Sequence, residues 1–179
     1  RSYSVTGVQT CALPIYLSGS LGLVVLRTAR AVAEGTSHDR ILADIPSWSD
    51  KADILVSVRT LRYMVRGGRV SPLQGLAAKI LNLKPIVSLE KDGSSKLYGK
   101  AFSVEANLRK ILEMTKGKHE DRKLKNYAVV HAHDPEGAGK LALRLKEALG
   151  FPPEYIMEIS SVIALNAGRG ALAVVSMAE

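Results

Sequence analysis

Cysteine, aromatic residues and long apolar runs are scarce in this sequence. Its single cysteine, Cys11, excludes an internal disulfide and any zinc site built on several cysteines. No stretch reaches the roughly eighteen consecutive apolar residues of a membrane-spanning helix, and the start lacks the basic, apolar and small-residue order of a signal peptide. Because 46% of the 179 residues are nonetheless hydrophobic, the chain can bury a core. We predict a soluble, cytoplasmic protein.

Acidic residues are fewer than basic ones, and the net charge of +8 raises the question of a nucleic-acid partner. Phosphate binding needs cations gathered on one face, but Lys and Arg are spread through helix-like stretches. The densest run, Lys116–Lys125, also holds Glu120 and Asp121 and is predicted to be a solvated loop. With only two Phe and one Trp, few rings are present on which bases could stack. We therefore predict no nucleic-acid partner.

The first residues show no pattern of a fold element. Val5–Ile15, VTGVQTCALPI, has neither a helix nor a strand period and no helix cap. This segment resembles, codon by codon, the translation of a widely used sequencing adapter. We interpret residues 1–16 as an adapter-derived artefact, exclude them from the functional argument, and expect them to pack against nothing in particular.

Helix signals recur through the rest of the chain. Apolar residues at helical spacing predict a helix over Leu21–Glu34 that ends at Gly35. Thr36 or Ser37 can cap a short helix that continues through Ile45. Further capping residues and glycine stops predict helices after Thr60, over Ser71–Asn82, over Val104–Thr115 with Ser103 as the cap, and from Asp134 to Leu149.

Strand-like composition lies between these helices. Turn chemistry at Lys91–Ser94 predicts that the strands on either side form a hairpin. Alternating strands and helices predict an α/β fold with a mixed sheet, flanking helices and the hairpin as an antiparallel edge. The predicted strands are Asp53–Val58, Lys84–Leu89, Lys96–Phe102, Asn126–His131, Tyr155–Leu165 and Ala171–Met177.

One histidine-rich segment has the residue types of a metal site. His131 and His133 would share a face of a strand, with Asp134 following directly. The sequence supplies no further ligand cluster, and Asp134 before Pro135 is typical of a helix cap. We therefore favour a structural role for this segment.

Two glycine-bearing segments have the composition of an anion site. Gly67–Ser71 places Arg69 after two glycines and just before a helix that Ser71 can cap. Asn166–Gly170 combines an amide, a guanidinium and backbone N–H groups in a loop predicted to follow a buried strand. Either segment suits a carboxylate or phosphate. The alternative, an arginine that pairs only with a local acid, stays open from composition alone.

The order and spacing of several segments resemble the DegV family. These segments are LRYMVRGGRVS, NLKPIVSL, HAHDPEGA and SVIALNAGRGALAVV, preceded by the helix LGLVVLRTARAVAEG. The resemblance covers about Leu21 to Glu179. It implies that residues 17–52 are a helical remnant of an amino-terminal DegV domain, that residues 53–179 are the carboxy-terminal domain, and that the protein is a truncated two-domain α/β protein.

The resemblance also implies a function. Members of the family bury a long-chain fatty acid and present its carboxylate to a partner kinase, so the protein is expected to be a carrier without an enzymatic activity, a metal or another cofactor. The head-group ligands implied here are Arg69, Ser71, Asn166, Gly168, Arg169 and Gly170. The alternative is a carboxy-terminal DegV-like domain of a multidomain enzyme that resembles dihydroxyacetone kinase.

The sequence departs from the family pattern at three places. Asn166 stands where the family usually has a histidine, and Arg169 replaces a proline. Ala101-Phe102 replaces an arginine-threonine pair at the start of the helix after the hairpin. We expect Arg69 and the segment Asn166–Gly170 to approach one another, and we expect this chain alone to hold a fatty acid weakly.

Overall fold

A six-stranded sheet is the centre of the computed structural model, which describes residues 19–68, 70, 83–89 and 95–179. The predicted helix over Ser71–Asn82, the turn at Lys91–Ser94 and the expectation for residues 1–16 lie outside the described residues.

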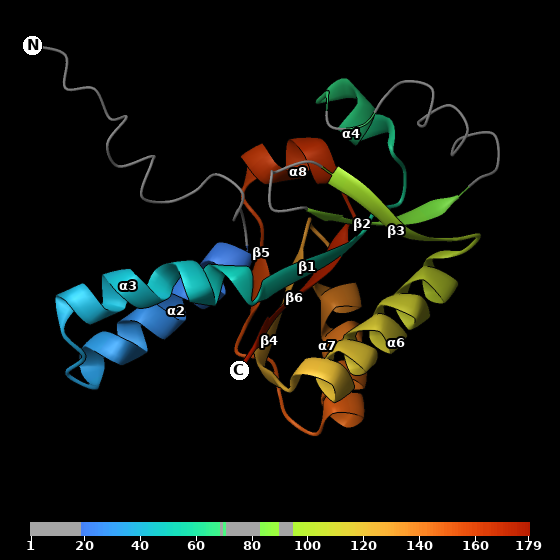
Figure 1. Cartoon of the computed structure of the whole chain (residues 1–179). Coiled ribbons are helices and arrows are strands. Elements are labelled where there is room, and N and C mark those ends of the chain that lie inside the picture. The colour runs from blue at the N-terminus through green and yellow to red at the C-terminus, as the bar shows by residue number, and fades with distance from the viewer. Residues whose placement is uncertain (1–18, 69, 71–82, 90–94) are drawn as a thin grey trace, which may run out of the picture.

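The sheet order is β3-β2-β1-β6-β4-β5 (Figure 1), and only the β4–β5 pair is parallel. The predicted mixed α/β fold is therefore confirmed. The strands are β1 (Ala52–Ser57), β2 (Lys84–Leu89), β3 (Ser95–Ala101), β4 (Leu124–His131), β5 (Ile156–Glu158) and β6 (Leu172–Ala178).

Helices cover both faces of the sheet (Figure 1). On one face, α6 (Val104–Arg122) and α7 (Pro135–Leu149) pack Ile111 and Leu145 against Tyr127, Val129 and Val174. On the other face, α2 (Gly19–Ala33) packs against the alternate residues of β4 and β6, and α3 (His38–Asp50) packs against α2. Burial on both faces explains the unbroken apolar runs of these two strands.

Two short helices lie at one end of the sheet. They are α4 (Arg62–Arg66), which follows β1, and α8 (Ser161–Ala167), which precedes β6. Both contribute to an apolar cluster with Val58, Val87 and Ala171. This end of the molecule, seen at the top of Figure 1, contains the candidate site described below.

Side-chain caps set several helix boundaries where the sequence predicts them. Ser37 accepts a hydrogen bond from the backbone N–H of Arg40, Ser103 accepts one from Ala106, and Asp134 accepts one from Gly137. Glycines with positive φ lie after α2 and α7, at Gly35 and Gly150, where the sequence predicts the helices to end. The three side-chain caps satisfy backbone N–H groups that a helix start leaves unpaired.

The predicted strand over Tyr155–Leu165 is wrong. Only Ile156–Glu158 pairs with β4, and the chain then forms α8 from Ser161. The physical reason is that a short apolar run suits a buried strand and a short helix equally well by periodicity. The end of β4 limits the ladder, because its last residue, His131, pairs with Glu158, and the residues that follow have no further part of β4 beside them.

The predicted loop over Lys116–Lys125 is also wrong, because α6 continues through Arg122. Lys118 and Arg122 both form ion pairs with Asp53 of β1, with N–O distances of 2.9 and 3.6 Å. The helix then ends at Lys123, whose φ is 49°. The run is solvated as expected, but it lies on a helix whose polar face contacts the start of β1.

Helix α2 is part of the main core. Leu23 is fully buried and packs with Ile54, Val130 and Val175 of the sheet. Arg30 binds Glu154 through two hydrogen bonds of 2.7 and 2.8 Å, which hold the pKa of Glu154 below its usual value.

The division of the chain at residue 52 stays a prediction. Among the described helices, none is long and apolar enough to cross a membrane.

Replacing Leu23 by alanine tests the role of α2. The change removes a fully buried side chain and leaves a cavity, so we expect a loss of about 2–5 kcal/mol in the free energy of unfolding. Val25→Ala is the matched control, because Val25 is 57% exposed on the same helix. Urea titrations followed by circular dichroism measure both. Equal, small losses would show that α2 does not contribute to the core.

Two of the six tyrosines are expected to titrate late. Burial raises the pKa of Tyr127 and of Tyr155 from 10.0 to about 12. Because both folded pKa values lie above the unfolded one, their contribution to stability is complete below about pH 10 and disappears between about pH 10 and 12. Ultraviolet absorbance titration and unfolding curves over this range measure the effect. A Tyr127→Phe variant should lose stability less steeply there; an unchanged slope would contradict the assignment.

Candidate functional site

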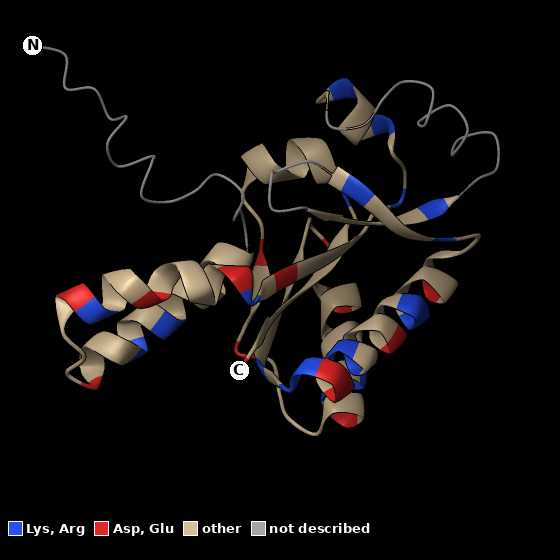
Figure 2. Ribbon diagram, in the orientation of Figure 1, with Lys and Arg blue, Asp and Glu red and all other residues tan. Residues whose placement is uncertain are grey.

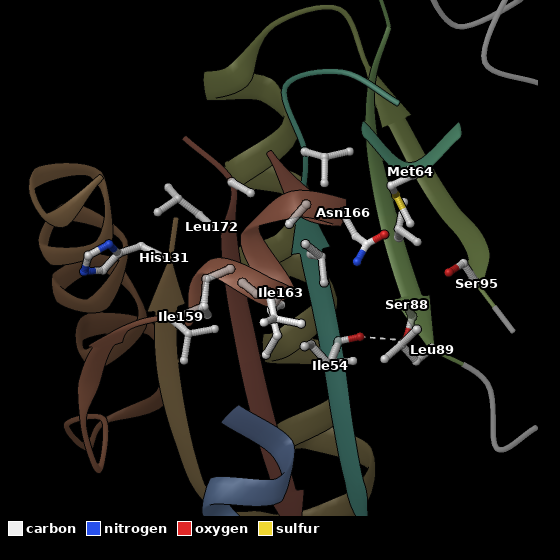
Figure 3. A pocket seen from close by; sticks show the side chains of 18 residues that line it. Ile54, Met64, Ser88, Leu89, Ser95, His131, Ile159, Ile163, Asn166 and Leu172 are labelled. Atoms are coloured by element: carbon white, nitrogen blue, oxygen red, sulfur yellow. Dashed lines mark hydrogen bonds between the residues drawn. The ribbon is translucent and has the colours of Figure 1, made fainter. Parts of the chain in front are cut away.

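An apolar cavity of about 190 Å³ lies under α8, on the sheet face that α2 covers further along. Its floor is formed by residues of β1, β2 and β6, and its roof by residues of α4 and α8 (Figure 3). The lining is mainly aliphatic and includes Ile54, Val56, Val87, Met64, Ile159 and Ile163. Such a surface suits the hydrocarbon part of a ligand.

Few polar side chains reach this cavity. The Ser88 hydroxyl donates a 2.6 Å hydrogen bond to the carbonyl of Ile54 (Figure 3), so it is already used within the sheet. The Nδ1 of His131 accepts a hydrogen bond from the N–H of Asp134. Asn166 differs from both, because its amide has no hydrogen-bond partner within the described part of the chain. It is the best-placed polar group for a ligand head group.

The histidine segment has the geometry of a helix start. Asp134 caps α7 as predicted, and His131 accepts from its backbone. His133 has a φ of 55° and lies 3.5 Å from Glu158, with both side chains exposed. No group of three or more possible metal ligands occurs among the residues that the structure describes.

The predicted segment Asn166–Gly170 has divided roles in the structure. It begins with the last two residues of α8 and continues into the turn before β6, instead of following a strand. Asn166 lines the cavity, whereas Arg169 is exposed. The N–H groups of Gly168 and Gly170 donate to the carbonyls of Ala164 and Ala132, so neither of these groups is available to a ligand in this conformation.

The described parts of the two segments Gly67–Ser71 and Asn166–Gly170 lie close together. Arg69 and Ser71 lie outside them, so their part in the site stays a prediction. Gly67, two residues before Arg69, contacts Asn166 so closely that an added methyl group would lie 2.0 Å from its Oδ1 atom. The chain around Gly67 therefore lies at the end of the cavity where Asn166 is found.

Arg59 is a residue at this end that the sequence reasoning missed. Its Nε donates to the carbonyl of Gly170, and its Nη2 lies 3.3 Å from Oδ2 of Asp134. No short motif marks Arg59. The available signal was the position of Arg59 in the sequence. Arg59 follows the strand β1 at the end of the sheet where β6 begins.

Positive charge surrounds this end of the cavity. Arg62 and Arg66 lie on α4, and neither α4 nor α8 has an acidic residue. Figure 2 shows the contrast with the mixed charges of α3 and α6. A positive potential near an apolar cavity favours a ligand with an anionic end.

Comparisons with known proteins agree on one family. The model described as "Uncharacterised protein, DegV family" matches residues 16–179. A DegV domain-containing protein of Clostridium perfringens is 30% identical over 149 residues, which are 83% of this chain and 52% of that protein. The chain therefore spans about half the length of this curated relative.

Solved structures of related proteins have the same fold. The chain matches a DegV family protein of Thermus thermophilus, described as binding fatty acid, with a TM-score of 0.79 and 27% identity over 92% of this chain and 59% of the other. It matches a fatty acid binding DegV family protein of Streptococcus agalactiae with a TM-score of 0.73 and 26% identity, over 88% and 56% of the two chains.

Replacing Gly168 by alanine tests the packing of the turn after α8. Its φ is +81°, and an added Cβ would lie 2.3 Å from the Tyr63 ring, so we expect a loss of about 2 kcal/mol or more in the free energy of unfolding. Gly139→Ala is the control. Gly139 is exposed within α7 with open space around it, so this change should stabilise the protein by about 0.5–1 kcal/mol. Thermal unfolding of both variants measures the difference. Equal effects would contradict the described turn.

Proposed function

Because the chain belongs to the DegV family, we propose that it forms part of a binding site for a long-chain fatty acid. The observation that carries this proposal is the aliphatic cavity with the unpartnered amide of Asn166 at its edge. The related proteins of Thermus thermophilus and Streptococcus agalactiae, both described as binding fatty acids, support it.

The lining of the cavity fits a hydrocarbon chain. Each methylene group removed from water contributes about 0.8 kcal/mol to binding, and side chains such as Ile54, Val87 and Ile163 offer no competing polar contact. The volume of about 190 Å³ is below the roughly 300 Å³ at which ligand sites usually begin. We propose that the parts of the DegV fold beyond this chain supply the remaining wall.

Asn166 and the surrounding cations suit a carboxylate head group. The Nδ2 of an amide donates to a carboxylate oxygen, and Arg62 and Arg66 place positive charge at the same end of the molecule. We propose Arg169, Arg69 and Ser71 as further ligands of the head group. Gly168 and Gly170 would act through the shape of the turn, since their N–H groups bind within the chain.

The proposed role is that of a carrier and not of a catalyst. A fatty acid whose hydrocarbon end is enclosed and whose carboxylate lies at the edge of the cavity is presented to a second protein. We propose that this partner is a fatty acid kinase, either separate or fused to the same polypeptide. Incubating the loaded protein with ATP, with and without such a kinase, tests this step; acyl phosphate formed without the kinase would contradict it.

The binding experiment compares two proteins. One is this chain, and the other is this chain fused to the part of the Streptococcus agalactiae relative that it does not match. If the chain alone covers half of a sixteen-carbon acid, it forfeits about 6 kcal/mol, or about four decades in Kd. Calorimetry with palmitic acid and mass spectrometry of co-purified lipid measure the difference. Equally tight binding by the chain alone would contradict the shared wall, and no binding by either would contradict the proposed function.

Replacing Val162 by aspartate tests the cavity itself. Val162 lines the cavity but is 73% exposed, so the change should leave folding intact while placing a carboxylate beside the hydrocarbon chain. We expect palmitic acid to bind the fusion at least about tenfold more weakly. Val25→Asp is the matched control, an exposed helical valine outside the cavity lining. A similar loss in both variants would show that the cavity is not the binding site.

A further inference from the structure

Residues 59–67, which lead out of β1, contact residues 166–170, which form the end of α8 and the turn after it, at three points. Arg59 contacts Gly170, the ring of Tyr63 lies against Gly168, and Gly67 lies against Asn166. An added Cβ at Gly170 would lie 2.3 Å from Nε of Arg59, and one at Gly168 would lie 2.3 Å from Cδ2 of Tyr63. Both approaches require glycine, which also fits the positive φ of both positions.

The spacing of the three contacts follows from the local backbone. Arg59, Tyr63 and Gly67 are four residues apart, about one helical turn, and α4 lies between the first and the last. Their partners, Gly170, Gly168 and Asn166, are two residues apart in the reverse order. The two segments therefore run past each other in opposite directions. The first segment makes one contact every four residues.

Other contacts anchor both ends of this arrangement. The guanidinium of Arg59 also binds Asp134, the cap of α7, and the N–H of Gly170 donates to Ala132 at a distance of 2.7 Å. The N–H of Gly67 donates to the carbonyl of Tyr63. The position of the turn is thus set by the ends of β1 and β4 and the start of α7.

Asn166 is the member of the set that faces the cavity. Its Oδ1 lies against Gly67, so its Nδ2 is directed elsewhere, and Figure 3 shows the amide among the residues that line the cavity. A methyl group at Gly67 would displace this amide without straining the backbone, because the φ of Gly67 is −80°. The contact at Gly67 therefore controls the direction of the donor.

We infer that Arg59, Tyr63 and Gly67 are positioning residues that aim the Asn166 amide at an anionic head group and so make the site prefer a carboxylate over an uncharged end of the same length. This inference rests on the proposed fatty-acid function. It assigns the preference to the contacts between residues 59–67 and residues 166–170. Arg59 acts through the turn and is not required to touch the ligand.

The test uses the full 179-residue chain and two probes, decanoic acid and 1-decanol, titrated by nuclear magnetic resonance. Gly67→Ala and Arg59→Gln should each shift the side-chain amide resonance of Asn166. Each change should raise the Kd of decanoic acid at least about fivefold and the Kd of 1-decanol less than about twofold. Arg59→Lys, which keeps the charge but not the planar fork, should behave like Arg59→Gln.

The background variant Asn166→Ala separates positioning from a general structural effect. In that background, Gly67→Ala and Arg59→Gln should change decanoic acid binding by less than about twofold, because the group they position is gone. Undiminished losses in that background, equal losses for both probes, or full recovery by Arg59→Lys would overturn the inference. So would an Asn166 resonance that neither change moves.

This design also separates the inference from the proposed function. If the unmodified chain binds neither probe and the fusion binds no palmitic acid, the proposed function fails. The Asn166 resonance still judges the contacts of Gly67 and Arg59 in that case, because its shift in Gly67→Ala and Arg59→Gln depends on the fold and not on a ligand.

Discussion

Strand β6 is the element on which the rest of the structure depends. All seven of its residues are buried, and it pairs with β1 on one side and β4 on the other. Leu172 and Val174 face α6 and α7, while Ala173, Val175 and Met177 face α2. The last residues of the chain therefore pair with residues of β1 that lie more than a hundred positions earlier, and both helical layers pack on this strand.

The candidate site exists because α2 covers only part of its face of the sheet. Residues of β1, β4 and β6 beyond the reach of α2 are covered by α8 and α4, which are short and pack loosely enough to leave a cavity. The cavity is apolar for the same reason that the core is apolar: its floor is the sheet face that continues under α2. A ligand there replaces side chains that a longer helix would have supplied.

Membership of the DegV family and the geometry of this end of the molecule point to the same chemistry. The enclosed surface is aliphatic, the one free amide lies at its edge within the described residues, and α4 is basic while α8 is uncharged. Glycines in the turn between α8 and β6 have structural roles, because their N–H groups bind within the chain and two side chains pack against them. Under the proposed function, selectivity for the head group depends on a few side chains and on the contacts that orient them.

The amino-acid sequence by itself determined the α/β class, five of the six strands, the hairpin edge and the helix starts at Ser103 and Asp134, and it narrowed a third start to Thr36 or Ser37. These features depend on local chemistry: β-branched composition, a side-chain oxygen that accepts from a nearby N–H, or a glycine that adopts positive φ. The sequence also identified Asn166–Gly170 as a segment of interest and Asn166 within it.

Only the tertiary structure decided whether Tyr155–Leu165 was a strand or a helix, because the local pattern suits both and the strand pairing stops at Glu158, where β4 ends. The same holds for α6, whose last turns are held by Asp53 of a distant strand. Arg59 and Tyr63 have no local signature. Their roles arise from contacts with residues more than a hundred positions away, and a distance of that kind is set by the packing of the whole chain.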